Sequence, residues 1–97
     1  YKLKDCYIGL QNGLYEKDGK SHSAIMLLKS QDGISFEFVK PFLVPQICNE
    51  NKWMAQYVYA CCLVKYKDKL RLYFNARNIS DNLRGRECIG FLEGQVK

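Results

Sequence analysis

The chain has 97 residues and a formal net charge of +5, from 15 Lys and Arg against 10 Asp and Glu. This length allows one small domain, and the 47% apolar content excludes a disordered tail. The longest uncharged apolar stretch, residues 58–64, is far shorter than the roughly 20 residues of a membrane span, so we expect no membrane partner. The positive charge permits a nucleic-acid partner but does not require one.

The number and spacing of the cysteines indicate whether the chain binds a metal and in which cellular compartment it lies. The five cysteines form no CxxC pair, and His22 is the only histidine, so we predict no zinc site, no other metal and no cofactor. Cys61 and Cys62 are interpreted as small buried hydrophobic residues. No signal peptide is visible, which predicts a cytoplasmic protein. The first residue is Tyr1 rather than Met, which suggests a piece of something longer.

In the first half of the chain, apolar and polar residues alternate with a period of two, which indicates strands. Asp-Gly pairs at residues 18–19 and 32–33 are strong turn signals. They predict strands over residues 13–16, 23–29 and 34–39. Because Pro41 and Pro45 flank residues 42–44, that segment is predicted to be an extended connector.

The second half shows the same pattern. Residues 57–66 are apolar on both faces, as in a buried strand, and residues 69–77 alternate. Lys67-Asp68 links these two segments as a hairpin, and residues 88–92 form a last strand. No amphipathic helix of ten or more residues is found, so the fold class is predicted to be all-β and antiparallel.

The two halves also form a loose internal repeat. The hairpin at Asp18 and the hairpin at Asp68 are 50 residues apart, and each leads into a strand, a loop and another strand. A period of about 40–50 residues is typical of propeller blades. A small sandwich is the alternative, because all hairpins favour Asp and Gly.

Three segments carry a family resemblance: SQDGISFE (30–37) with KPFLVP (40–45), VYACCLVKYKDKLRLYFNAR (58–77) and GRECIGFLEG (85–94). They resemble the blade motifs of five-bladed β-propeller glycosidases, a superfamily that includes arabinanase/xylosidase-like, fructosidase-like and mannosyl-phosphorylase-like enzymes. The resemblance implies antiparallel four-stranded blades. The chain would then be a single β domain holding two blades, about 1–47 and 48–97, of a longer protein. Further blades of the same protein, or self-association, would complete it.

The resemblance also bears on catalysis, because glycoside hydrolysis needs two carboxyl groups across the scissile bond. Residues 59–63 match the "W-A-P-D-V" stretch of the arabinanase/xylosidase-like branch, but Cys62 stands at the position of the Asp. A thiol supplies no fixed negative charge near neutral pH unless its pKa is strongly lowered. We therefore expect no complete catalytic pair in this chain. The candidate carboxylates are Glu50, in a polar loop, and Glu87, which is better explained by a structural ion pair with Arg77.

Four other residues are candidates for binding a sugar. Trp53 and Tyr59 offer aromatic faces on which a pyranose could stack. Asn75 and Arg77 offer planar donors for hydroxyl groups, although packing explains all four equally well. The predicted function is a glycoside hydrolase-like, carbohydrate-active domain that binds or cleaves a glycan. The alternatives are a non-catalytic carbohydrate-binding or assembly domain and, less favoured, a small basic nucleic-acid-binding domain.

Overall fold

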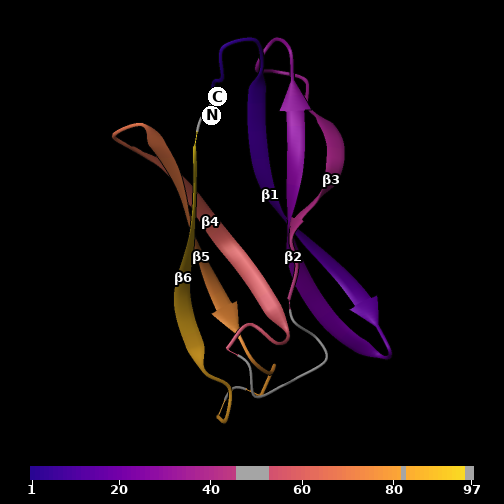
Figure 1. Cartoon of the computed structure of the whole chain (residues 1–97). Coiled ribbons are helices and arrows are strands. Elements are labelled where there is room, and N and C mark those ends of the chain that lie inside the picture. Colours follow the sequence, from indigo (N-terminus) through magenta and orange to yellow (C-terminus); the bar gives the residue numbers. More distant parts are fainter. Residues whose placement is uncertain (46–52, 82, 96–97) are drawn as a thin grey trace.

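The computed structural model describes residues 1–45, 53–81 and 83–95. These residues form six strands and no helix, in two meanders of three strands each (Figure 1). The strands are β1 (Tyr7–Lys17), β2 (Lys20–Ser30), β3 (Glu37–Leu43), β4 (Tyr57–Tyr66), β5 (Lys69–Arg77) and β6 (Glu87–Gln95). The prediction of an all-β fold is confirmed. The described residues thus contain no helix that is long and apolar enough to cross a membrane.

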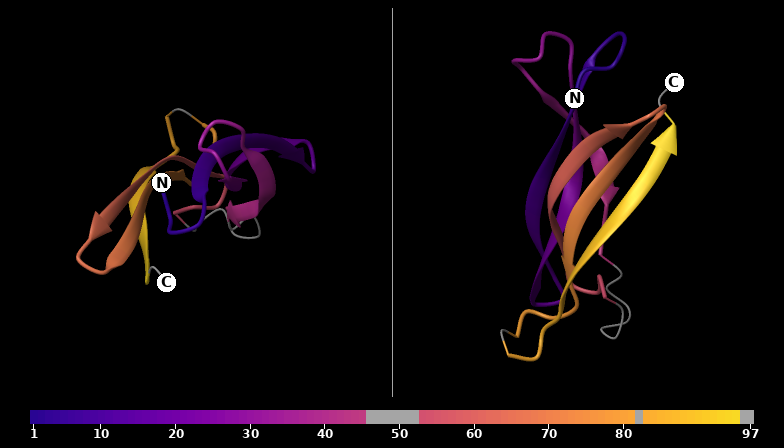
Figure 2. Two further views of the ribbon diagram at one scale, coloured as in Figure 1. Left: turned by 90° about the horizontal axis from the view of Figure 1, so that it is seen from above. Right: turned by 90° about the vertical axis from the view of Figure 1, so that its left-hand side faces the viewer.

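The two meanders meet in one open sheet. β2 pairs antiparallel with β1 and β3, and β5 pairs antiparallel with β4 and β6. A single parallel pair, Ser23 with Tyr57, joins β2 to β4. From this junction the two strands run in the same direction and diverge, so the meanders separate (Figures 1 and 2). Each meander has three described strands, where a blade of the expected type has four.

The predicted hairpin turns are confirmed. At Asp18-Gly19 both residues have positive φ angles, 54° and 76°, as a type I′ hairpin turn requires. At Lys67-Asp68 only Lys67 is left-handed, with φ of 57°. A side chain with a Cβ is strained in this region, whereas glycine is not.

We expect Lys67→Gly to raise the free energy of unfolding by about 0.5–1 kcal/mol, because relief of the left-handed strain outweighs the added backbone entropy of glycine. Lys65→Gly is the control, because Lys65 lies in β4 and glycine weakens a strand. Urea titration of both variants measures the difference. A destabilised Lys67→Gly variant would contradict this account of the turn.

The structure corrects the prediction around the third strand. β3 begins at Glu37 rather than at residue 34, and it continues through Pro41 to Leu43, where a connector was expected. Pro41 is tolerated because β3 pairs only with β2 and its register shifts on both sides of the Met26–Pro41 and Leu27–Lys40 pairs. An edge strand with irregular pairing loses little from a missing N–H group.

The structure also corrects the expectation of a buried fourth strand. In β4 only Val58 is buried, and most of the C-terminal half is exposed because the other meander diverges from it. Cys62 is exposed, so its interpretation as a buried residue is wrong. Cys61 is partly buried and packs against the core, as expected.

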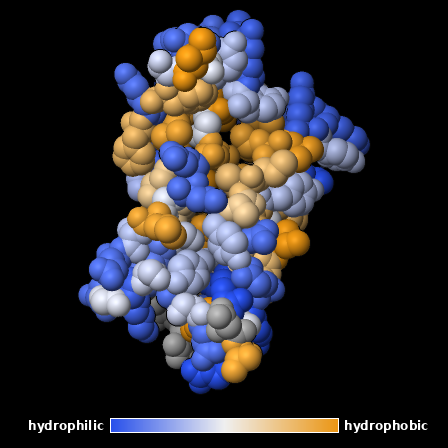
Figure 3. All heavy atoms as spheres, turned by 180° about the vertical axis from the view of Figure 1, so that it is seen from behind, coloured by the Kyte–Doolittle hydropathy of each residue, from blue (hydrophilic) through white to orange (hydrophobic). Residues whose placement is uncertain are grey.

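A small core lies at the junction of the meanders. It consists of Ile25, Met54, Val58, Phe74 and Ala76. Beyond it, a groove of about 400 Å³ between the meanders is lined mainly by leucines of β1, β2, β4, β5 and β6. Apolar side chains also lie exposed among polar ones on the face shown in Figure 3. The described sheet therefore leaves apolar surface uncovered.

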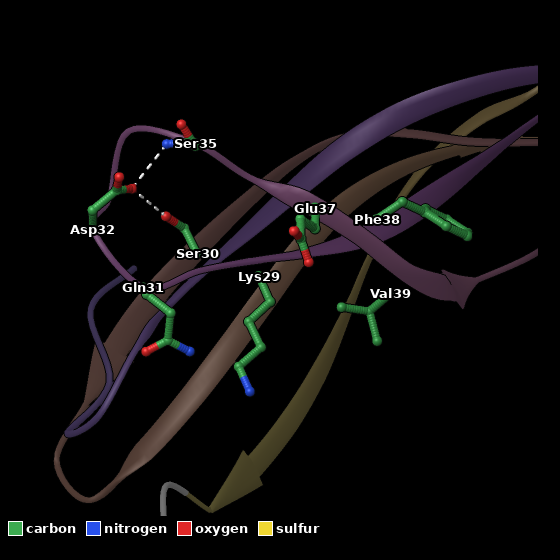
Figure 4. A pocket seen from close by; sticks show the side chains of 8 residues that line it. All are labelled: Lys29, Ser30, Gln31, Asp32, Ser35, Glu37, Phe38 and Val39. Carbon is green, nitrogen blue, oxygen red and sulfur yellow. Dashed lines mark hydrogen bonds between the residues drawn. The ribbon is translucent and has the colours of Figure 1, made fainter.

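The turn between β2 and β3 is organised by one carboxylate. Oδ1 of Asp32 accepts hydrogen bonds from the N–H groups of Ile34 and Ser35, at 2.8 and 2.9 Å, and from the hydroxyl group of Ser30 at 2.9 Å (Figure 4). These donors, Ser35 N–H first, hold the pKa of Asp32 below its ordinary value. The side chains of Lys29, Gln31 and Glu37 surround this turn.

The lowered pKa predicts an acid-sensitive turn. Because the folded-state pKa lies below the unfolded value, the ionised Asp32 stabilises the protein above the ordinary carboxyl range, and this contribution is lost as the pH falls through the folded pKa. We expect Asp32→Asn to lower the melting temperature near pH 7, and we expect its difference from the unsubstituted protein to shrink as the pH falls below the ordinary carboxyl range. Melting curves across this range test the prediction. A constant difference at all pH values would contradict it.

Candidate functional site

A hollow of about 500 Å³ lies beside the junction of the two meanders. It is lined by residues of β1, β2, β4 and β5, of the loop after β5, and by the first residue of β6: Asn12, Leu14, Ser23, Tyr57, Tyr59, Arg77, Ser80 and Glu87. Three of these are aligned across the second meander, because Tyr57 pairs with Arg77 and Arg77 pairs with Glu87. The strand ladder thus brings an aromatic ring, a cation and a carboxylate to one edge of the hollow.

Three side chains that line this hollow form a hydrogen-bonded group. The hydroxyl group of Tyr59 donates to Oε1 of Glu87 at 2.5 Å, and Nη1 of Arg77 donates to the same oxygen at 3.2 Å. The ion pair between Arg77 and Glu87 confirms the structural pairing predicted from the sequence. The structure therefore brings together three of the six candidate residues.

Arg77 is held on three sides. Nε donates to the carbonyl oxygen of Ile79 at 2.8 Å, and Nη2 donates to that of Asp81 at 2.6 Å. Gly85 leaves the space for this arrangement, because a Cβ there would lie 2.6 Å from the Asp81 carbonyl oxygen and would overlap the guanidinium group. The guanidinium group is thus fixed before any ligand arrives, which lowers the entropy cost of binding.

Tyr59 is kept in its neutral form. Burial, and then the hydrogen bond to Glu87 and its negative charge, raise the pKa of Tyr59. A phenol with a raised pKa acts as a hydrogen-bond donor at neutral pH and is a weak nucleophile. The Tyr59–Glu87 pair is consequently suited to holding hydroxyl groups rather than to covalent catalysis.

A β-bulge in β4 lies next to Tyr59. Ala60 has a φ angle of 52°, and the ladder with β5 shifts between Tyr59 and Cys62. The N–H group of Ala60 donates to Oδ1 of Asn12 at 2.9 Å, which ties β4 to β1 across the hollow. Bulges that redirect side chains are frequent beside binding sites, and the strain at Ala60 persists only because neighbouring groups hold it.

The remaining candidates lie elsewhere. Trp53 packs against the opposite face of the second meander, stacked on Phe74 with ring centroids 5.8 Å apart and close to Gly90. Trp53 and Tyr59 therefore do not form one stacking platform. Asn75 lies opposite Tyr59 in the β4–β5 ladder, just outside the lining of the hollow. Glu50 lies outside the described residues.

Five lining residues were not among the six candidates: Asn12, Leu14, Ser23, Tyr57 and Ser80. Three of them belong to the first meander, and no local pattern marks them, because their role depends on how β1 and β2 pass the second meander. Ser80 lies in the loop after β5, where no local pattern marks it as part of a site.

The lining of the hollow limits the chemistry that its described residues can perform. Glu87 is the one carboxylate among the described lining residues, whereas glycoside hydrolysis uses two. Across the described ranges, no three His, Cys, Asp or Glu side chains gather as metal ligands would. Comparison with known proteins found no matching family model, no matching curated protein and no matching solved structure.

Proposed function

We propose that the chain binds a carbohydrate in the hollow formed around Tyr59, Arg77 and Glu87. The observation that carries this proposal is the hydrogen-bonded group of these three side chains, which presents aromatic carbon, a cation and an anion within one hollow. Sugar hydroxyl groups both donate and accept hydrogen bonds, so paired charges with a fixed geometry suit them. The apolar side chain of Leu14 adds a surface for the carbon face of a ring.

We further propose that the two meanders are neighbouring sectors of a β-propeller. In support, each meander runs antiparallel in chain order, and the hairpin turns at residues 18–19 and 67–68 occupy equivalent places between the first two strands. The apolar groove and the exposed apolar side chains suit a sheet that further blades, or further copies, would cover. This interpretation makes the carbohydrate site part of a larger surface.

Binding is favoured over cleavage because the described hollow contains a single carboxylate, which is paired with Arg77. The alternative is a hydrolase whose second carboxylate lies outside the described residues. Turnover of aryl-glycosides would favour that alternative. A nucleic-acid-binding domain is the third candidate, and a steep loss of affinity with added salt would favour it.

The test is titration with neutral xylo-, arabino-, fructo- and manno-oligosaccharides, followed by calorimetry or NMR. We expect at least one class to bind with little dependence on salt, and Tyr59→Phe to weaken that binding about two- to tenfold through loss of one hydroxyl group. Tyr66→Phe is the matched control, because Tyr66 lies at the exposed end of β4. No binding across the series, or equal effects of both substitutions, would overturn the proposal.

A further inference from the structure

A second, polar hollow of about 420 Å³ borders the first, and the two share Ser80. It lies between the turn of the first hairpin and the loop that follows β5. Its described lining consists of Gly19, Lys20, Ser21, Gln56, Ile79, Ser80, Asp81 and Arg84. The two walls of this hollow are about 60 residues apart in the chain, so no local sequence pattern predicts that they form one site.

Gln56 ties the walls of this second hollow together. Its Nε2 donates to the carbonyl oxygen of Ser21 at 2.8 Å, and its Oε1 accepts from the N–H group of Ser80 at 2.9 Å. Gln56 is buried, so these two hydrogen bonds hold the two walls of the hollow at a fixed separation. The hydroxyl group of Ser21 is also 2.6 Å from that of Tyr57, which lines the first hollow. The two hollows are therefore connected through one hydrogen-bonded framework.

The charges around the second hollow are unequal, because Lys20 and Arg84 face a single anion, Asp81. The Asp81 carboxylate is already used inside its own loop. Oδ1 accepts the N–H groups of Leu83 and Arg84 at 2.8 and 3.0 Å, and Oδ2 lies 3.1 Å from Nε of Arg84. Lys20 has no ion-pair partner in the described part of the chain. The hollow is thus left with an excess of positive charge.

We propose that this second hollow holds the carboxylate of an acidic sugar unit while a neighbouring unit occupies the hollow at Tyr59. This inference rests on the proposed function and narrows it to oligosaccharides that contain uronic acid. Lys20 supplies the unpaired positive charge. The guanidinium group of Arg84, which is paired with Asp81, adds N–H donors, and Ser21 and Ser80 supply hydroxyl groups. The shared framework through Gln56 and Tyr57 sets the spacing between the two units.

The test compares trigalacturonic acid with its methyl ester, which has the same backbone without the negative charges. We expect the acid to bind about fivefold more tightly at low salt and the difference to shrink in 1 M salt. Lys20→Gln should weaken binding of the acid about three- to fivefold and leave binding of the ester unchanged. Lys65→Gln is the control, because it changes the net charge equally at the distant end of β4.

Each outcome separates this inference from the proposed function. Equal affinity for the acid and the ester overturns the inference and leaves the proposed function standing. If neutral oligosaccharides bind but neither trigalacturonic acid nor its methyl ester binds, the inference is likewise overturned and the proposed function stands. Equal losses in Lys20→Gln and Lys65→Gln also overturn the inference, because the attraction would then come from net charge alone. If no saccharide of any kind binds, both proposals fall.

Discussion

Replacing Phe74 with alanine is expected to lower the free energy of unfolding by about 3–5 kcal/mol. Phe74 is 2% exposed and contacts the core at the junction of the meanders, where Ile25 and Val58 are also fully buried. The described core has only five residues, so neighbouring side chains have little freedom to fill the cavity. A domain has a total stability of only about 5–15 kcal/mol, so the loss should remove a large part of it and lower the urea midpoint clearly.

Phe91→Ala is the matched control for this experiment. Phe91 is also a phenylalanine in the second meander, but it is 56% exposed and packs mainly against Tyr73 and Arg71. Its loss should cost about 1 kcal/mol or less. Urea unfolding followed by Trp53 fluorescence measures both variants, since Trp53 stacks on Phe74. Similar losses in the two variants would show that the core lies elsewhere.

The second large effect concerns Arg77. Arg77→Lys is expected to weaken carbohydrate binding at least about tenfold, because an ammonium group cannot reproduce a guanidinium fork that binds two carbonyl oxygens and a carboxylate. The carbonyl oxygens of Ile79 and Asp81 would lose their donors. We therefore also expect a loss of about 1–3 kcal/mol in the free energy of unfolding.

The control for Arg77→Lys is Arg86→Lys. Arg86 is exposed, and it contributes to the fold through its backbone N–H group, which donates to Oδ1 of Asn78 at 2.7 Å. A lysine at this position keeps that bond. Calorimetric titration gives the affinity, and urea titration gives the stability. If Arg77→Lys bound sugar normally, the fixed guanidinium group would have no part in recognition.

Gly85 links the conformation of the loop after β5 to the first hollow. The Arg77 guanidinium group fills the space that a side chain at residue 85 would need. The loop also carries Ser80, Asp81 and Arg84, which line one or both hollows. The same guanidinium group therefore positions the first hollow and shapes a wall of the second.

Local chemistry determined where most strands lie, although β1 begins at Tyr7, before the predicted segment, and β3 is shifted toward the C-terminus. Alternating side chains and Asp-Gly turns act over a few residues, so the strands and hairpins of the second half were predicted almost to their ends. Alternation also placed Asn75 and Arg77 on one face of β5, and the ion pair between Arg77 and Glu87 followed from neighbouring strands. These features can be predicted from local sequence alone, because they do not depend on how the two meanders pack together.

Only the tertiary structure decided which faces come together. The bulge at Ala60 shifts the register of β4, so Cys62 faces outward and Cys61 packs on the core. Trp53 lies on the opposite face from Tyr59, where it stacks on Phe74 close to Gly90. A glycine in a strand does not indicate which distant side chain will pack against it. Asn12 and Ser80 joined the site because β2 and β4 meet at one residue pair and then diverge. Contacts between residues so far apart in the chain depend on the angle at which whole meanders pack, and no short stretch of sequence encodes that angle.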